Sequence, residues 1–258
     1  MELKDKEKGW VAKFRGVHIM EITTIIGCKN MCSYCPQDVI IKAYKGYKGI
    51  RLLSFENFKK ILENIPKDVE LYFAGHSEPF LNKESSLMLK YAIESGYNVV
   101  MYTTLVGFTD NDLEILASIN GQFGGIAFHR FDGVGYDRED FNRKQNLVRT
   151  KVLGIDPIPM DDDTSGRVVG ALSRAGNVWE ETARSGKLFC SSAPKFDNNS
   201  MMPNGDVYLC CMDYGLKHKL GNLMETHYDQ LDRSVVNELA SKEESDILCR
   251  KCVVARYH

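Results

Sequence analysis

Short apolar runs alternate with amphipathic stretches along this chain up to about residue 185. The apolar runs have the length of strands and cover residues 17–22, 69–73, 99–103, 125–128, 152–158 and 167–172. The stretches with helical periodicity cover residues 55–65, 85–95, 110–119 and 138–150. Ser54 is the predicted N-cap of the first helix, and Gly96 closes the second. The alternation predicts an α/β fold in which a parallel sheet has helices outside it.

The pattern changes near residue 185, and the tail beyond it is rich in cysteine. Five of the eight cysteines lie there. The sequence Pro203-Asn204-Gly205-Asp206 is typical of a tight turn, so we expect a hairpin of two short strands around it. We therefore predict a domain over residues 1–185 and a smaller cysteine-rich extension over 186–258.

Composition and charge exclude several classes of partner. The 258 residues carry 33 Lys and Arg against 35 Asp and Glu, a net charge of −2, so no overall field attracts nucleic acid or an anionic membrane. The first ten residues are charged and no apolar run approaches roughly 20 residues, so we expect neither a signal peptide nor a membrane span, and a cytoplasmic protein. In a reducing cytosol, eight cysteines indicate metal or redox sites rather than disulfides.

Three cysteines follow the first predicted strand in the run Cys28-x3-Cys32-x2-Cys35. A structural zinc site takes four protein ligands, whereas an iron–sulfur cube takes one thiolate per iron. Three thiolates would leave one iron of a cube open for chemistry. The loop also lies at the carboxyl end of a strand, where ligands collect in α/β proteins. The alternatives are a zinc knuckle with a distant fourth ligand, and reduced cysteines that only pack.

The run, with Tyr34 before its last cysteine, resembles the signature of the radical S-adenosylmethionine (AdoMet) superfamily. The resemblance implies a partial (β/α)6 TIM-like barrel and a [4Fe–4S] cluster on Cys28, Cys32 and Cys35, with AdoMet chelated at the open iron. A reductant such as flavodoxin or ferredoxin would then drive cleavage of AdoMet to a 5′-deoxyadenosyl radical, which abstracts a hydrogen atom from the substrate.

A second segment, Phe73-Ala-Gly75-His-Ser77-Glu78-Pro79, is similar to the Gly-Gly-Glu-Pro segment of that family. The resemblance implies that Glu78 accepts a charge-assisted hydrogen bond from the AdoMet ammonium group. Ser77 stands where glycine is usual. A turn with a solvated glutamate is the alternative.

Other candidate contacts follow the later strands or precede the tail. Arg174 lies between the barrel mouth and the extension, where its rigid fork of donors could bind the AdoMet carboxylate or orient a substrate hydroxyl; a surface ion pair is the alternative. We take Arg174 as the candidate catalytic residue. The candidate AdoMet contacts are Tyr34, Gly75, Ser77, Glu78, Thr103, Thr104 and His129.

The tail carries a second cysteine pattern, Cys190-x14-Gly205-x4-Cys210 followed by Cys249-x2-Cys252. It resembles the SPASM/twitch extension of radical AdoMet enzymes, which implies one auxiliary [4Fe–4S] cluster held by these four cysteines. Four thiolates close a cluster, so it would relay electrons or stabilise the extension. A zinc ribbon is the alternative. Cys211 is left over and either packs or donates a hydrogen atom.

Size and cysteine layout look most like the radical 2-deoxy-scyllo-inosamine dehydrogenases. That likeness implies a small-molecule substrate, a sugar or cyclitol whose secondary alcohol is oxidised while an electron passes to the auxiliary cluster. A carbohydrate epimerase, which needs a hydrogen-atom donor, and a maturase of ribosomal peptides are alternatives within the superfamily. A zinc-stabilised binding module is the alternative outside it.

Overall fold

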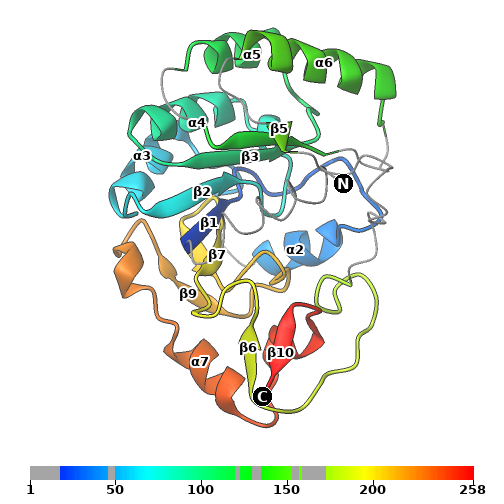
Figure 1. The fold of residues 1–258 in the computed structure, drawn as a ribbon, viewed down its shortest axis with the longest axis vertical. Helices are drawn as coiled ribbons and strands as arrows, with labels where there is room; N and C mark the ends of the chain where they lie inside the picture. The colour runs from blue at the N-terminus through cyan, green and yellow to red at the C-terminus, as the bar shows by residue number, and fades with distance from the viewer. Residues whose placement is uncertain (1–17, 46–49, 120–122, 130–134, 153–156, 159–172) are drawn as a thin grey trace, which may run out of the picture.

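The computed structural model describes residues 18–258 except 46–49, 120–122, 130–134, 153–156 and 159–172 (Figure 1). Five strands are parallel neighbours in one sheet: β1 (His18–Ile22), β2 (Val69–Phe73), β3 (Val99–Thr103), β4 (Gly125–Phe128) and β5 (Pro157–Ile158). The helices that follow them are α2 (Gln37–Tyr44), α3 (Phe55–Glu63), α4 (Ser85–Glu94), α5 (Asp110–Ala117) and α6 (Arg138–Lys151). A short 3-10 helix, η1 (Pro79–Leu81), follows β2.

The sheet continues into the extension. β7 (Asn198–Met201) pairs in parallel with β1, and β8 (Asp206–Tyr208) and β9 (Lys219–Asn222) add antiparallel strands beyond it. The order β5-β4-β3-β2-β1-β7-β8-β9 is an open sheet of the described residues. The predicted turn at Pro203–Asp206 is confirmed, because β7 and β8 form the hairpin and Gly205 has a φ of +84°.

The rest of the extension lies beside this sheet. β6 (Leu188–Cys190) pairs antiparallel with β10 (Ala255–Tyr257) as a separate two-stranded sheet. Between β9 and β10 the chain forms η2 (Tyr228–Gln230), α7 (Ser234–Ser241) and η3 (Leu248–Lys251). The boundary at 185/186 stays a prediction.

Most predicted elements are confirmed. The first four parallel strands lie where the apolar runs predicted them, and the Ser54 side chain caps α3 by accepting a hydrogen bond from the Asn57 N–H at 3.2 Å. Two differences stand out. The predicted strand over 152–158 is reduced to Pro157–Ile158 in the described chain, because Val152 is the C-cap of α6. The predicted strand over 167–172 lies outside the described residues.

Helix α2 was not predicted, and it connects the first cysteine loop to the extension. Its buried residues Ile40 and Tyr44 pack in one cluster with Tyr208 and Tyr214 of the extension. The helix has only eight residues, and most of the buried residues that pack with it lie more than 150 positions later in the chain. Local periodicity carries little information about such a helix.

The two faces of β1 have different surroundings. Met20 and Ile22 belong to the main core under the helices, while Ile19 packs with Tyr72 in a smaller cluster on the opposite face. Because side chains alternate along a strand, Glu21 lies on the same face as Ile19. We call this face, which carries Ile19, Glu21, Tyr72, Val100, Tyr102 and Ala127, the inner face of the sheet.

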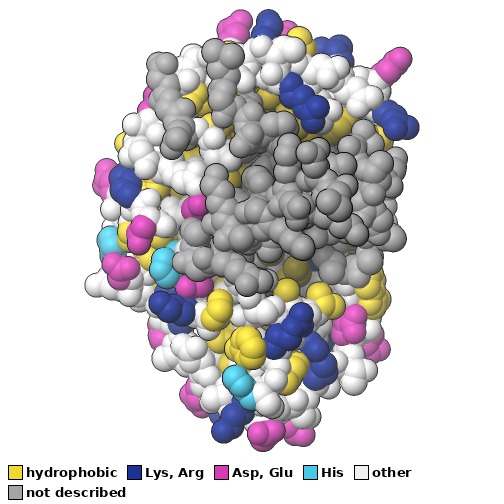
Figure 2. Space-filling model, in the orientation of Figure 1, with side chains coloured by type: hydrophobic (Ala, Val, Ile, Leu, Met, Phe, Trp, Pro, Cys, Tyr) yellow, Lys and Arg dark blue, Asp and Glu magenta, His cyan; other side chains and the backbone are white. Residues whose placement is uncertain are grey.

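Charged side chains of both signs lie on the described part of the face seen in Figure 2. On the face seen in Figure 2, Lys and Arg are interspersed with Asp and Glu, in keeping with the net charge of −2. Within the described part of the chain, no helix has both the length and the apolar character needed to cross a membrane.

Candidate functional site

The three-cysteine loop joins β1 to α2, and Gln37 fixes both of its ends. The Gln37 side-chain oxygen accepts a hydrogen bond from the Cys28 N–H at 3.0 Å. The side-chain nitrogen of Gln37 donates to Cys35 Sγ at 3.2 Å and to the His76 carbonyl at 2.6 Å. Gln37 thereby also ties the cysteine loop to the loop after β2. Sequence analysis missed this residue, whose only signal was a polar side chain two positions after Cys35.

The loop after β2 carries Glu78, which is buried and surrounded by donors. One carboxylate oxygen accepts from the Phe80 N–H at 3.2 Å and from Thr103 Oγ1 at 2.7 Å, and the other accepts from the N–H and Oγ1 of Thr104, both at 2.6 Å. Burial raises the pKa of Glu78, and the hydrogen bonds from Thr104 and Thr103 oppose that rise. Three predicted site residues are thus brought together.

These contacts limit how the Glu78 carboxylate could accept a hydrogen bond from the AdoMet ammonium group. A carboxylate offers about four lone-pair positions, and all four are filled. An ammonium group could therefore be accepted only in exchange for one of the present donors. The role predicted for Glu78 stays a prediction.

Polar atoms without partners lie near this cluster. Asn30, in the cysteine loop, donates from Nδ2 to Thr104 Oγ1 at 2.9 Å, which joins the loops after β1 and β3. Asn30 Oδ1 and Ser77 Oγ are buried and have no hydrogen-bond partner among the described residues. Because such atoms cost about 1–3 kcal/mol when left unpaired, they fit a ligand that carries polar groups of its own, as AdoMet does.

Gly75 is required by the path of the loop after β2. Its φ is +77°, and a Cβ there would lie 2.4 Å from Thr23 Oγ1. The same hydroxyl accepts a hydrogen bond from the His76 N–H at 3.2 Å. The backbone at Gly75 therefore lies directly on the end of β1, where a side chain has no room.

Two further predicted residues are neighbours. The rings of Tyr34 and His129 meet edge to face, with 6.0 Å between their centroids. Tyr34 is buried, and His129 follows β4. The structure thus brings the cysteine loop to the carboxyl end of β4.

Arg174 lies between the first cysteine loop and the extension. It interacts electrostatically with Tyr214, Cys211, Cys35 and Glu21, and its Nε is a buried atom without a hydrogen-bond partner in the described chain. The Asn177 side chain donates to the Arg174 carbonyl at 2.6 Å and to the Met212 carbonyl at 3.1 Å, which holds this turn against the extension. Arg174 thus lies between the first cysteine loop and the extension, as expected from the sequence. Its catalytic role stays a prediction.

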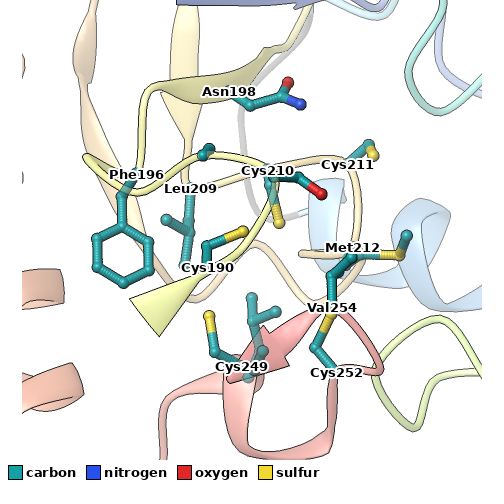
Figure 3. A pocket seen from close by; sticks show the side chains of 14 residues that line it. Cys190, Phe196, Asn198, Leu209, Cys210, Cys211, Met212, Cys249, Cys252 and Val254 are labelled. Carbon is teal, nitrogen blue, oxygen red and sulfur yellow. The ribbon is translucent and has the colours of Figure 1, made fainter. Parts of the chain in front are cut away.

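The other four predicted cysteine ligands line one cavity in the extension, with a volume of about 200 Å³ (Figure 3). Cys190 ends β6, Cys210 follows β8, Cys249 lies in η3, and Cys252 directly follows η3. No group of three His, Cys, Asp or Glu side chains in the described chain is placed to hold a single metal ion. The cavity exceeds the roughly 30 Å³ share of one water molecule, so it has room for a polyatomic cluster.

The cavity walls suit a cluster ligated by thiolates. No Asp, Glu, Lys or Arg lines it; the other lining residues are Ser192, Ala193, Phe196, Asn198, Leu209, Cys211, Met212, Leu248, Val254 and Ala255. Burial raises the pKa of Cys210 and of Cys252, and that of Cys249 to about 12. These thiols would lose their protons only to a cationic group that binds them.

Cys211 also lines this cavity, but its sulfur does not point into it. In Figure 3 its sulfur points away from the four cysteines around the cavity. Its thiol lies close enough to Glu21, on the inner face of the sheet, and to Arg174 to interact with both electrostatically. Cys211 therefore connects the extension with the inner face.

His76 and Tyr214 lie between the two sets of cysteines. Their rings meet edge to face with 4.6 Å between centroids, and Tyr214 Oη lies 3.8 Å from Cys35 Sγ. His76 is 1% exposed, and neither ring nitrogen has a hydrogen-bond partner in the described chain. Burial lowers the pKa of His76 to about 4, so the ring is neutral near pH 7.

Comparison with protein families identifies the extension. The model of SPASM, an iron–sulfur cluster-binding domain, matches residues 194–253. This range includes Cys210, Cys249 and Cys252, while Cys190 precedes it. The description favours iron–sulfur over the zinc ribbon. A search of curated proteins finds no match to the chain.

Comparison with solved structures identifies the fold. BtrN in complex with AdoMet and 2-DOIA has a TM-score of 0.62 at 18% identity, covering 92% of this chain and 93% of that one. Native anSMEcpe with bound AdoMet has a TM-score of 0.53 at 13% identity, covering 91% and 86%. The anSMEcpe structure with AdoMet and the Cp18Cys peptide has a TM-score of 0.51 at 12% identity, covering 92% and 86%.

The predicted resemblance is thereby confirmed for the fold and for the extension. The chain has the mostly parallel, partial-barrel fold of the radical AdoMet enzymes and carries a SPASM-type iron–sulfur extension at its C-terminal end.

Proposed function

We propose that this protein is a radical AdoMet oxidoreductase that converts a secondary alcohol of a sugar- or cyclitol-like molecule to a ketone. The observation that carries the proposal is the pair of cysteine sets: three on the loop between β1 and α2, and four around a cavity in the extension. A three-thiolate cluster leaves an iron open for AdoMet, whereas a four-thiolate cluster can only exchange electrons. When bound, these groups supply the hydrogen-abstracting radical and the electron acceptor.

The protein's own residues would hold and orient these groups. Cys28, Cys32 and Cys35 would ligate the first cluster, and Cys190, Cys210, Cys249 and Cys252 the auxiliary cluster. The chain of hydrogen bonds from Asn30 through Thr104 to Glu78 lies where the AdoMet amino end would bind, so these side chains would orient it. Arg174, with an unused donor, would orient the substrate hydroxyl.

The similar solved structures support a small molecule as the substrate. A peptide is the alternative class of substrate. BtrN is described with AdoMet and 2-DOIA, and its chain matches this one over nearly its whole length. The anSMEcpe structure with a bound peptide has the lower TM-score of 0.51. A flavodoxin or ferredoxin would serve as the reductant.

The first test is the metal content and reactivity of protein purified without oxygen. We expect about eight iron atoms per chain, from two cubes. With a reductant, AdoMet and 2-DOIA or neutral cyclitols as probes, 5′-deoxyadenosine and a ketone should form in equal amounts. Colourless protein with stoichiometric zinc would contradict the enzymatic function and favour the zinc-stabilised binding module.

A carbohydrate epimerase is the second candidate, favoured by the contact between Cys211 and Glu21. This contact directs a thiol that is absent from both predicted ligand sets toward the inner face. An epimerase would return a hydrogen atom from this thiol to the substrate radical, and the thiol would regain an electron from the auxiliary cluster and a proton from solvent.

Reaction in D2O separates the two candidates. The oxidoreductase gives a ketone and tolerates Cys211→Ala. The epimerase gives an alcohol that carries one solvent-derived deuterium at the inverted carbon, and Cys211→Ala abolishes it. Cys249→Ala, a change in a predicted ligand, is the matched comparison and should impair both reactions.

A further inference from the structure

We propose that Glu21 is the proton acceptor of the reaction, taking the hydroxyl proton from the substrate radical on the inner face of the sheet. This role rests on the proposed alcohol oxidation and adds to it a residue that belongs to none of the recognised motifs. Three features of the structure support it: the surroundings of Glu21, its contact with the extension, and an unpaired hydroxyl beside it.

The register of the sheet places Glu21 between two polar neighbours. Its partner on β2 is Tyr72 and its partner on β7 is Ser200, and partners in register point to the same face. Ser200 is fully buried, and its Oγ has no hydrogen-bond partner among the residues that the structure describes. An unpaired buried hydroxyl beside a carboxylate indicates a polar ligand that completes both.

The extension brings further groups to the same carboxylate. The Cys211 thiol and the Arg174 guanidinium both lie close enough to Glu21 to interact with its carboxylate electrostatically. Cys211 directly follows Cys210, a predicted ligand of the auxiliary cluster. The proposed proton acceptor therefore lies beside the residue that directly follows a predicted ligand of the electron acceptor.

The proposed step balances as follows. Loss of a hydrogen atom from the carbinol carbon leaves a radical that still carries its hydroxyl group. The O–H proton passes to the Glu21 carboxylate, one electron passes to the auxiliary cluster, and the carbon–oxygen bond becomes a C=O double bond. The protonated Glu21 then returns its proton to solvent.

The electrostatic surroundings suit a base. Burial raises the pKa of Glu21, while the Cys211 thiol and the charge of Arg174 oppose the rise. The titratable and charged groups that face it are Tyr72 from β2, Tyr102 from β3, Cys211 after β8, and Arg174. A carboxylate whose pKa moves toward neutrality is a more effective acceptor near pH 7.

The test compares Glu21→Gln with Glu70→Gln, using carbinol-deuterated 2-DOIA and carbinol-deuterated myo-inositol as probes. Glu70 is a carboxylate nearer the amino end of β2, hydrogen-bonded to Asn98 and Tyr72. Iron content, thermal unfolding, deuterium in 5′-deoxyadenosine, ketone yield and the electron paramagnetic resonance spectrum are measured for each. The ratio of ketone to 5′-deoxyadenosine is also followed against pH.

In E21Q we expect label transfer to continue while ketone falls about 100-fold or more, with a substrate-centred radical in the spectrum. E70Q should keep the ketone yield. In the wild type the ratio of ketone to 5′-deoxyadenosine should fall as pH drops through the raised pKa of Glu21. In E21Q this dependence on pH should disappear. Should E21Q fold poorly, Glu21→Asp keeps a carboxylate and should give an intermediate ketone yield with the pH dependence retained.

Other outcomes overturn the role. Ketone formation in E21Q within threefold of the wild type would show that another group takes the proton. Equal losses of label transfer and ketone would make Glu21 a residue that only positions the substrate. Absence of 5′-deoxyadenosine in the wild type, with both clusters present, would instead overturn the proposed function on which the role rests.

Discussion

Tyr214 of the SPASM region places its hydroxyl 3.8 Å from Sγ of Cys35 in the first cysteine loop. When Cys35 is a thiolate ligand, the hydroxyl is the donor of this contact. Hydrogen bonds to cluster sulfurs are one determinant of reduction potential. The extension would thus act directly on a cluster held by Cys35, through a side chain that also packs on His76.

Tyr214→Phe should make the first cluster harder to reduce. Loss of a hydrogen bond of about 0.5–1.5 kcal/mol corresponds to roughly 20–60 mV for a one-electron couple, and the midpoint potential should fall by that amount. A redox titration followed by electron paramagnetic resonance measures it. Tyr97→Phe is the control, since Tyr97 donates to the Leu62 and Ile65 carbonyls and its loss should leave the potential unchanged. Equal potentials in Y214F and wild type would contradict the contact.

Gly75→Ala and Gly96→Ala test the crowding at the AdoMet loop. Both glycines have positive φ, but an added Cβ meets Thr23 Oγ1 at 2.4 Å at Gly75 and open space at Gly96. Both variants should lose about 1–2 kcal/mol from the left-handed backbone. Only G75A should also weaken AdoMet binding, by at least about tenfold, as measured by equilibrium dialysis. Equal affinities in the two variants would show that the path of this loop does not matter for AdoMet.

Arg250 should be essential to the folding of the extension. It is 3% exposed, and its guanidinium donates to the carbonyls of Arg184, Gly186 and Lys242 at 2.9, 3.0 and 2.6 Å. Arg250→Met removes all three charge-assisted hydrogen bonds made by this buried guanidinium, at a cost of about 3 kcal/mol or more. Tm should fall by about 6–12 °C, with loss of iron from the auxiliary site.

Two comparisons sharpen that experiment. Arg250→Lys should recover little of the lost Tm, because an ammonium group cannot reproduce the planar fork of donors. Arg256→Met is the control, since Arg256 is exposed and, within the described chain, donates to the carbonyls of Val253 and Ala255, both within three positions of it. A Tm loss in R256M as large as in R250M would show that the buried network is not the cause.

His76 should make stability depend on pH. Its pKa is about 4 in the folded chain and 6.5 in the unfolded chain, so the unfolded chain binds the extra proton between these values. The free energy of unfolding therefore decreases as pH falls from about 6.5 to 4, by about 3 kcal/mol from this residue. Denaturant unfolding of His76→Gln should lack this component. Above pH 7 the free energies of unfolding of the wild type and of His76→Gln should differ by a constant amount. If the two free energies plotted against pH stay parallel down to pH 4, the prediction is contradicted.

Much of the fold and part of the site could be predicted from local sequence. The runs that became β2, β3 and β4 are buried strands bounded by clear helix signals such as Ser54 and Gly96, so periodicity alone located them. The cysteine spacings separated a three-thiol loop from a four-thiol set because each spacing is itself a chemical constraint. The SPASM match identifies the extension, and the four cysteines of the second set line one cavity there; their role as ligands stays a prediction.

What the sequence did not reveal depends on contacts between distant segments. Gln37 joins the first loop to His76 across 39 positions, and Glu21 meets Cys211 only because β7 lies beside β1. A glutamate in a short strand and a glutamine at a helix start have no distinctive local pattern. The sequence likewise left two interpretations of Cys211 open, packing and hydrogen-atom donation, because it did not show which residue lies beside the thiol.

The parallel pairing of β7 with β1 limits how the extension can be exchanged between relatives. Asn198–Met201 supplies the hydrogen-bonding partner for Ile19–Ile22, so removal of the tail uncovers a strand edge next to the first cysteine loop. A truncated barrel would present that edge for aggregation. In a chimaera that takes its extension from another enzyme, the new β7 must therefore pair with β1 in the same register. Only then does its activity report on the catalytic residues.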